Sequence, residues 1–243
     1  LAQPRYFPVP SPGAAESGGV EGFLDPVAFS VDHGFFDASF TVSLSGPAAG
    51  AEIRFTTDGS APGTGSSLYT SPLTVSGTTV LRAAAFKPGW QPSIPNTRTY
   101  LFPDQVVVQN NTPAGYPSSW NAIAADYAME DNAVDLAAIL GQPAGTPLTV
   151  LRQQVKQALL ALPAISIVTD RASLFDSATG IYTNPSGRGD LWEKPCSAEL
   201  IPRPGSSEAG FQINGGIQVM GLTSRNLTVN ARLPLRVIFS RKF

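Results

Sequence analysis

Carboxylates gather in one short stretch of this sequence, and carboxylate oxygens are the ligands that a hard cation prefers. Asp126, Glu130 and Asp131 can share one face of a turn, as the acids of Ca²⁺ sites do. No EF-hand spacing accompanies them, and nothing in the sequence singles out a pair of acids for glycoside hydrolysis. Solvated loop residues are the more ordinary interpretation. We therefore expect no cofactor, with Ca²⁺ as the alternative that this stretch leaves open.

Basic side chains gather near the C-terminal end, where residues 211–243 contain no acid. Arg225, Arg232 and Arg236 are the candidates for contacting a phosphate or another anion. The glycines around them match neither the dinucleotide-binding fingerprint nor the GxxxxGK[ST] loop, so a strand with permissive bends is the more ordinary interpretation. The formal net charge of the chain is -2, which predicts no nucleic-acid partner.

Three tryptophans, Trp90, Trp120 and Trp192, can stack on sugar rings, which would make a surface polysaccharide a partner. Tryptophans of this kind are more often partly buried anchors. Cys196 is the single cysteine, so no intramolecular disulfide can form, and a buried inert thiol is expected. His33 is the single histidine, which excludes a site built from several imidazoles.

The composition favours an extracellular or cell-surface protein. Charged residues make up 14% of the chain, well below the roughly 25% of ordinary soluble domains. The 23 glycines and 22 prolines predict many turns and few long helices. No apolar run approaches the roughly 20 residues of a membrane-spanning helix. Because the chain begins with Leu1 and ends within a strand pattern, we expect it to have been cut from a longer protein.

The pattern along the chain predicts four segments. Residues 1–22 are a linker or extended strap, and residues 23–102 alternate in hydrophobicity between turn signals, which is typical of a β-sandwich. Residues 103–162 are a connecting segment with one helix, capped by Thr146 and started by Pro147. Residues 163–243 mix strands with short helical turns. The fold class is therefore mainly β, with an α+β second part.

Residues 51–88 carry a specific pattern: a strand ending in TTDGS, then LYTSPL, then TTVLRAAAF. This pattern resembles the chitobiase/β-hexosaminidase C-terminal module, also called a fibronectin-type-III-associated domain. The resemblance implies an immunoglobulin- or fibronectin-type-III-like sandwich with a non-catalytic, accessory role. Asp58 and Gly59 supply the tight turn that the pattern requires, so Asp58 is expected to be structural.

Residues 163–243 resemble the beginning of the spore-coat-protein-H (CotH) family of bacterial proteins. The pieces that carry the resemblance are LPAISIVTD, GIYTNP, LWEKPCSAELI and GFQINGGIQVMG. Relatives of that family include atypical protein kinases, whose catalytic and metal-binding acids lie beyond the matched stretch. ATP and Mg²⁺ are therefore implied only if a complete kinase domain follows. Arg232 and Leu233 stand where the family has two lysines, and arginine does not replace lysine at a phosphate site.

These observations predict a non-catalytic extracellular module with a structural, adhesive or assembly role, attached to a partial CotH-like α+β domain. One alternative is the N-terminal portion of an atypical secreted ATP-dependent protein kinase. A second alternative is a carbohydrate-binding accessory module. The strand expected over 235–239 is apolar enough to be buried on both faces, so its edge should pair with another part of the polypeptide or with a second subunit.

Overall fold

The computed structural model describes residues 5–7, 19–46, 48–120, 123–221, 225 and 233–239. Strands hold 32% of the residues and helices 16%, which confirms the prediction of a mainly β chain with several sheets. The chain divides into two compact units. The first unit comprises residues 1–32, 40–75 and 80–98, and the second comprises 33–39, 76–79 and 99–243. Short pieces of the segment expected to form the sandwich thus cluster with the second unit.

The first unit is built from short antiparallel strands, as the alternating pattern predicts. They are β1 (Ala28–Phe29), β3 (Phe40–Val42), β4 (Leu44–Ser45), β5 (Glu52–Thr56), β6 (Ser67–Leu68), β7 (Leu73–Val75) and β8 (Thr79–Phe86). β1 pairs with β4 and β3 with β7, while β5 lies between β6 and β8. This arrangement of several small sheets is consistent with a sandwich-like domain.

The longest strand of the first unit, β8, is buried on both of its faces. Its central residues from Leu81 to Ala85 are each at most 6% exposed. Alanines on both faces allow neighbouring elements to approach closely, which suits a strand inside a core. The next strand, β9 (Asn96–Leu101), lies beside β8 in the sheet order, and its chain continues into the second unit.

The turn after β5 has the structure that its sequence predicts. The Asp58 carboxylate accepts hydrogen bonds from the Ser60 backbone N–H at 3.1 Å and from the Ser60 hydroxyl at 2.5 Å. Gly59 has φ +84°, a left-handed conformation that favours glycine. Its carbonyl accepts a 2.8 Å hydrogen bond from Arg82, which fixes the turn to β8. Asp58 therefore has the structural role expected of it.

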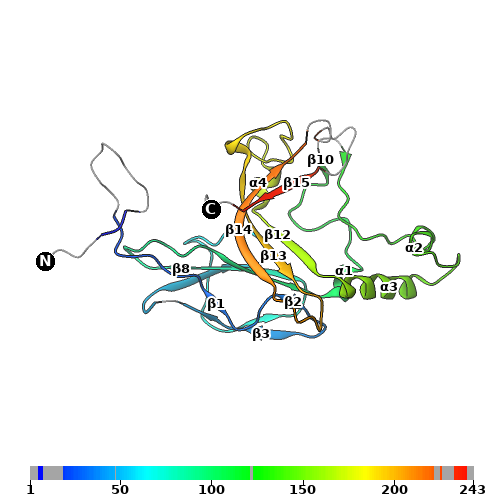
Figure 1. Ribbon diagram of the computed structural model, residues 1–243, viewed down its shortest axis with the longest axis horizontal. Helices are drawn as coiled ribbons and strands as arrows, with labels where there is room; N and C mark the ends of the chain where they lie inside the picture. Colours follow the sequence, from blue (N-terminus) through cyan, green and yellow to red (C-terminus); the bar gives the residue numbers. More distant parts are fainter. Residues whose placement is uncertain are drawn as a thin grey trace. The chain divides into compact units, whose positions relative to one another are not determined.

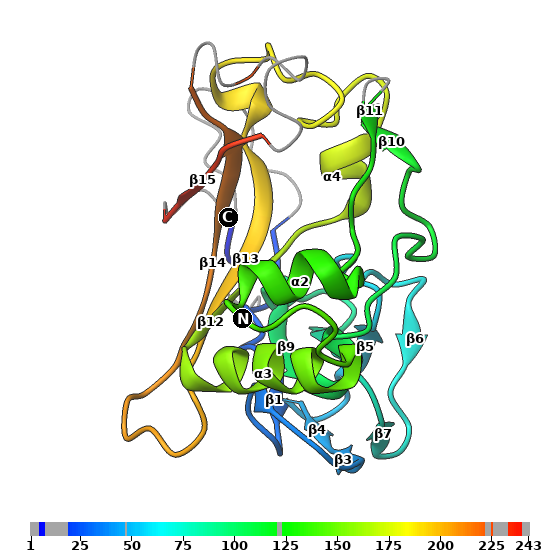
Figure 2. The same cartoon turned by 90° about the vertical axis from the view of Figure 1, so that its right-hand side faces the viewer.

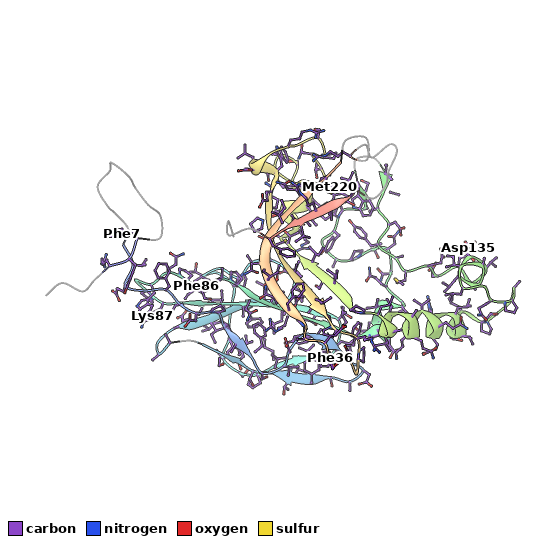
Figure 3. The ribbon with its side chains drawn as sticks, viewed as in Figure 1. Phe7, Phe36, Phe86, Lys87, Asp135 and Met220 are labelled. Atoms are coloured by element: carbon purple, nitrogen blue, oxygen red, sulfur yellow. The ribbon has the colours of Figure 1, made fainter. Side chains whose placement is uncertain are left out.

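The second unit is organised around one antiparallel sheet, with strands in the order β12-β13-β14-β15 (Figure 1). Their bounds are β12 (Ala164–Val168), β13 (Lys194–Ile201), β14 (Phe211–Val219) and β15 (Leu235–Ile238). These strands confirm the β-rich pattern predicted after residue 163. The unit also holds β2 (Gly34–Phe35), parallel to the end of β9, and the hairpin of β10 (Ser119–Trp120) and β11 (Ile123–Ala124). Phe36, labelled in Figure 3, packs against the rings of Tyr100 and Phe102.

Helices of the second unit partly match the prediction. They are α1 (Pro103–Val106), α2 (Ala133–Ile139), α3 (Leu148–Ala161) and α4 (Arg171–Phe175), with a 3-10 turn at Asp190–Trp192. α3 is the expected helix, but the expected cap is wrong: the Thr146 hydroxyl donates to the Pro143 carbonyl, and Pro147 occupies the N-cap position without a side-chain bond. α2 was not predicted. It packs on α3 through Leu136, Ala137 and Leu151 (Figure 2).

The prediction that the last strand is buried on both faces is wrong. Leu235 is 41% exposed, Arg236 is exposed, and the other two residues of β15 are half-buried. Short strands at a sheet end have one neighbour, and β15 pairs with β14 alone among the described strands. In the described part of the chain, no helix has the length and apolar character that a membrane crossing requires.

Candidate functional site

Arg225, one of the predicted anion contacts, donates its hydrogen bonds to backbone carbonyls. Its Nε donates to the Gly221 carbonyl at 2.7 Å, and its Nη2 donates to the Val219 carbonyl at 2.5 Å. Its Nη1 donates to the carbonyls of Pro185 and Gly187, at 3.1 and 2.6 Å. The guanidinium thus ties a loop to the end of β14, which is a structural role that uses donors an anion would need.

The other predicted anion contacts give no closed site. Arg236 is exposed and donates a 2.6 Å hydrogen bond to the Gln218 side chain, and Arg232 lies outside the described residues. Burial lowers the pKa of Arg225, and the positive charges of Arg188 and Arg236 lower it further. Arg188 and Arg236 therefore lie close enough to Arg225 to repel its charge, which makes this part of the described structure locally positive.

Trp120 lies in an aromatic cluster of the second unit. Its Nε1 donates a 2.9 Å hydrogen bond to the Tyr127 hydroxyl, which in turn donates to the Pro117 carbonyl at 3.0 Å. The rings of Tyr127 and Tyr182 meet the indole edge to face, with centroids 5.2 and 5.6 Å away. Burial raises the pKa of Tyr127 above its ordinary 10.0.

A cavity of about 210 Å³ opens beside this cluster. Three aromatic rings, two hydroxyl-bearing side chains and one proline line it: Trp120, Phe175, Tyr182, Ser119, Thr183 and Pro117. Aromatic faces and hydroxyl groups are the side-chain types that suit a sugar ring, so this cavity is where the carbohydrate prediction for Trp120 has a geometric setting.

The other two tryptophans serve as anchors. Trp90 lies under the ammonium group of Lys87, labelled in Figure 3, at 4.5 Å from the ring centroid. A Cβ on Gly22 would lie 2.6 Å from the Trp90 ring, so the backbone there packs against the indole. Trp192 is half-buried and packs on the core of the second unit, with Gly187 against its ring. Both side chains are occupied by packing.

The predicted cation ligands are exposed and do not come together as a site. The Glu130 carboxylate accepts a 2.8 Å hydrogen bond from the Asn132 backbone, just before α2 begins. Asp126 and Asp131 are exposed as well. Among the residues that the structure describes, no group of three or more His, Cys, Asp and Glu side chains is placed to hold a metal ion.

A buried carboxylate that the sequence did not single out lies on β13. The Glu199 side chain is 0% exposed, and its Oε1 lies 3.0 Å from Nδ1 of His33, whose side chain is 4% exposed. The Thr99 backbone N–H donates to Oε1 at 3.2 Å, and the Thr99 hydroxyl donates to Oε2. The Ser166 hydroxyl lies 2.7 Å from that of Thr99 and extends the network. Sequence offered one weak signal, an acid between apolar residues in the run AELI.

One face of the sheet in the second unit carries buried polar side chains. Residues Ser166, Glu199 and Gln212 are in register across β12, β13 and β14, so they share one face with Ser197. The opposite face carries Ile165, Ile167, Ala198, Leu200, Phe211 and Ile213. On that face Ile165 is 71% exposed and Phe211 48%. We call these six residues the apolar face.

The apolar face continues a buried core along the same side of the sheet. Cys196 and Ile217 extend it toward the far end of β13 and β14, where they pack with Ile181, Val219 and Leu233. The burial expected for Cys196 is confirmed, at 3% exposure. One half of this side of the sheet is therefore covered and the other half is open. Sequence analysis missed the open half because an apolar strand residue gives no sign of which layer will cover it.

Comparison with known families supports one part of the chain. Residues 31–99 match the family model described as chitobiase/beta-hexosaminidase C-terminal domain, which confirms the first resemblance. The family comparison gives no evidence for the CotH resemblance of residues 163–243. Searches among curated proteins and among solved structures found no match to this chain.

Proposed function

We propose that this chain is a non-catalytic module of an extracellular or cell-surface protein, with a role in assembly, attached to a partial CotH-like domain. A domain of the chitobiase/beta-hexosaminidase C-terminal kind over residues 31–99 supports an accessory part. The CotH-like identity of residues 163–243 rests on the motifs in the sequence alone.

The observation that carries the assembly role is the apolar face. Four of its side chains are at least 41% exposed, and they lie together on three neighbouring strands: Ile165, Ile167, Phe211 and Ile213. The largest apolar patch on a soluble protein is often functional, and such a patch can bind another polypeptide or a ligand. A covering layer would complete the half-open core of the second unit.

The kinase alternative would make this chain the N-terminal portion of an ATP-dependent enzyme. Positioned phosphates and metal ions are the basis of phosphoryl transfer. Arg225 gives its donors to backbone carbonyls, which weighs against its use on a nucleotide. We therefore expect no ATP turnover from residues 1–243 in the presence of Mg²⁺. Turnover that is lost in the Arg236→Ala variant would contradict the proposed function.

Carbohydrate binding is the second candidate, and the cavity beside Trp120 favours it. Co-sedimentation of the chain with insoluble chitin and cellulose tests this role directly. Retention on either polymer that is abolished by Tyr182→Ala, with the helical and sheet content unchanged by circular dichroism, would replace assembly with carbohydrate binding as the function. We expect no retention, because Trp120 is only 9% exposed and its ring already meets Tyr127 and Tyr182.

A further inference from the structure

A second cavity of the second unit lies along α3, and its walls are wholly apolar. Its volume is about 320 Å³, and ten residues line it, all of them Phe, Leu, Val, Pro or Ala. All ten belong to the second unit. Their side chains carry no charge and form no hydrogen bonds, so the lining offers no group that would recognise a sugar, a nucleotide or an ion.

One wall of this cavity is a stripe on α3. The lining residues of the helix and its C-cap stand at positions i, i+3, i+4 and i+7, which share one face: Val155, Ala158, Leu159 and Leu162. With a rise of about 1.5 Å per residue, this stripe is about 10 Å long. The cavity therefore extends along about two turns of helix.

The rest of the wall comes from strand ends and from α1. Phe35 of β2 and Leu101 of β9 are neighbours in a parallel pair, and Pro103 follows at the first position of α1. The Lys156 ammonium group donates to both oxygens of the Asp104 carboxylate at 2.7 Å, which joins α3 to α1 beside the cavity. The walls are therefore held in place without a ligand, as in most small-molecule sites.

The cavity opens to solvent near the end of α3. Leu162 is 65% exposed although it belongs to the lining, and Ala158 is exposed as well. A ligand in the cavity would remove these apolar side chains from water, which favours binding. An apolar protein cavity of about 150 Å³ binds benzene, so the larger volume here fits a larger hydrocarbon group.

Length and volume together select an alkyl chain. A zigzag of carbon–carbon bonds of about 1.5 Å covers about 10 Å with about eight carbons. A leucine or phenylalanine side chain of another polypeptide is shorter and would leave part of the cavity empty. Two turns of helix, about 10 Å wide and about 10 Å long, occupy about 800 Å³, more than twice the volume of the cavity.

We propose that this cavity binds an unbranched alkyl chain of about eight carbons, carried by a small amphiphile whose polar head group stays in solvent beside Leu162. The chain lies along the stripe on α3. This inference goes beyond the proposed assembly role and is independent of it, because the cavity and the apolar face share no residue.

The test is isothermal titration calorimetry of the chain of residues 1–243 with hexanol, octanol and decanol. Octanol should bind with a Kd below about 1 mM. Each methylene group that enters the cavity should strengthen binding about fourfold, so octanol should bind roughly fifteenfold more tightly than hexanol. Decanol should gain less than about fourfold over octanol, because the cavity is then filled along its length.

Two variants with matched controls locate the site. Ala158→Phe places a ring in the cavity and should weaken octanol binding about tenfold or more, whereas Ala138→Phe, at an exposed position of α2, should change it less than about twofold. Leu162→Asp places a charge at the opening and should weaken binding about fivefold. Its control is Leu191→Asp, at a position that is 86% exposed and outside the lining. Circular dichroism checks that each variant keeps its fold.

Three results would overturn the inference: no octanol binding by the unmodified chain, a full fourfold gain per methylene beyond octanol, or unchanged binding by Ala158→Phe. Sedimentation equilibrium adds a fourth, because a dimer that octanol dissociates would make a second copy of the chain the occupant. ATP turnover or retention on a polysaccharide would contradict the proposed function and leave the octanol result standing, so the two failures are distinguishable.

Discussion

The two units of this protein bury different kinds of side chain on their central strands. In the first unit β8 is buried on both faces, and three of its side chains are alanines that fill a core. In the second unit β13 buries Glu199 and Ser197, both 0% exposed, on one face, while on the other face the neighbouring strands β12 and β14 expose apolar side chains to solvent. In the first unit, apolar packing fills the core around β8. In the second unit, buried hydrogen bonds hold one face of the sheet, and part of the opposite face stays exposed.

Removing the buried carboxylate of the second unit should have the largest effect. Glu199→Ala removes the buried acceptor that faces His33 and receives two hydrogen bonds from Thr99, at a cost of about 3 kcal/mol in the free energy of unfolding. Urea unfolding of the purified chain measures it. The control is Glu52→Ala in the first unit, whose carboxylate pairs with Arg54 but is 57% exposed, and its cost should stay within about 0.5 kcal/mol. Similar costs for the two variants would contradict the contrast between the units.

A smaller loss should follow from changing the arginine that joins a loop to β14. Arg225→Lys keeps the charge but removes the forked donors that reach the carbonyls of Val219, Gly187 and Pro185, so we expect a loss of about 2 kcal/mol. Arg236→Lys, at an exposed site, should cost less than about 0.5 kcal/mol. If both variants unfold at the same urea concentration as the unmodified chain, Arg225 does not fix that loop.

The turn of the first unit should be sensitive at one glycine and tolerant at another. Gly59→Ala forces a Cβ into a backbone with φ +84° and should cost about 1 kcal/mol. Gly63→Ala is the control, because no heavy atom lies within 4 Å of the Cβ it would add and its φ is not left-handed. Thermal unfolding of both variants gives the comparison, and an unchanged midpoint for Gly59→Ala would show that the turn does not need a left-handed residue.

The smallest expected effect is a loss of stability at acidic pH through protonation of Asp176. The backbone N–H and hydroxyl of Thr179 and the N–H of Ala178 donate to the Asp176 carboxylate, which holds its pKa below the ordinary 3.8. Because the folded state favours the ionised form, this contribution to stability is present above the ordinary pKa. It is lost as the pH falls through the folded pKa. A carboxyl titration by NMR should give a midpoint below 3.8 that rises in Thr179→Val. A midpoint at or above 3.8 would exclude these bonds in solution.

Predictions from sequence succeeded where the signal was local. The alternating pattern predicted strands in both units but missed most of the two-residue ones, and Asp58 and Gly59 identified a turn that the structure contains. Helical spacing found α3, although its cap was wrong because Thr146 bonds back to Pro143 in the preceding loop. α2 was missed since its seven residues are too few to establish a period. The grouping of acids at residues 126–131 suggested a site, but exposed loop residues close in sequence need not converge.

The sequence by itself indicated the longer strands of this protein and a recognisable domain pattern, which the family match at residues 31–99 confirms, because period, turn chemistry and motif are properties of neighbouring residues. Only the tertiary structure decided which face of each strand is buried. Alternating polar and apolar residues show that the two faces of a strand differ. Which face is buried depends on the distant segment that packs against it. His33 and Thr99 come from far along the chain to bury the acid on β13, and this bonding leaves Ile165 and Phe211 on the open side.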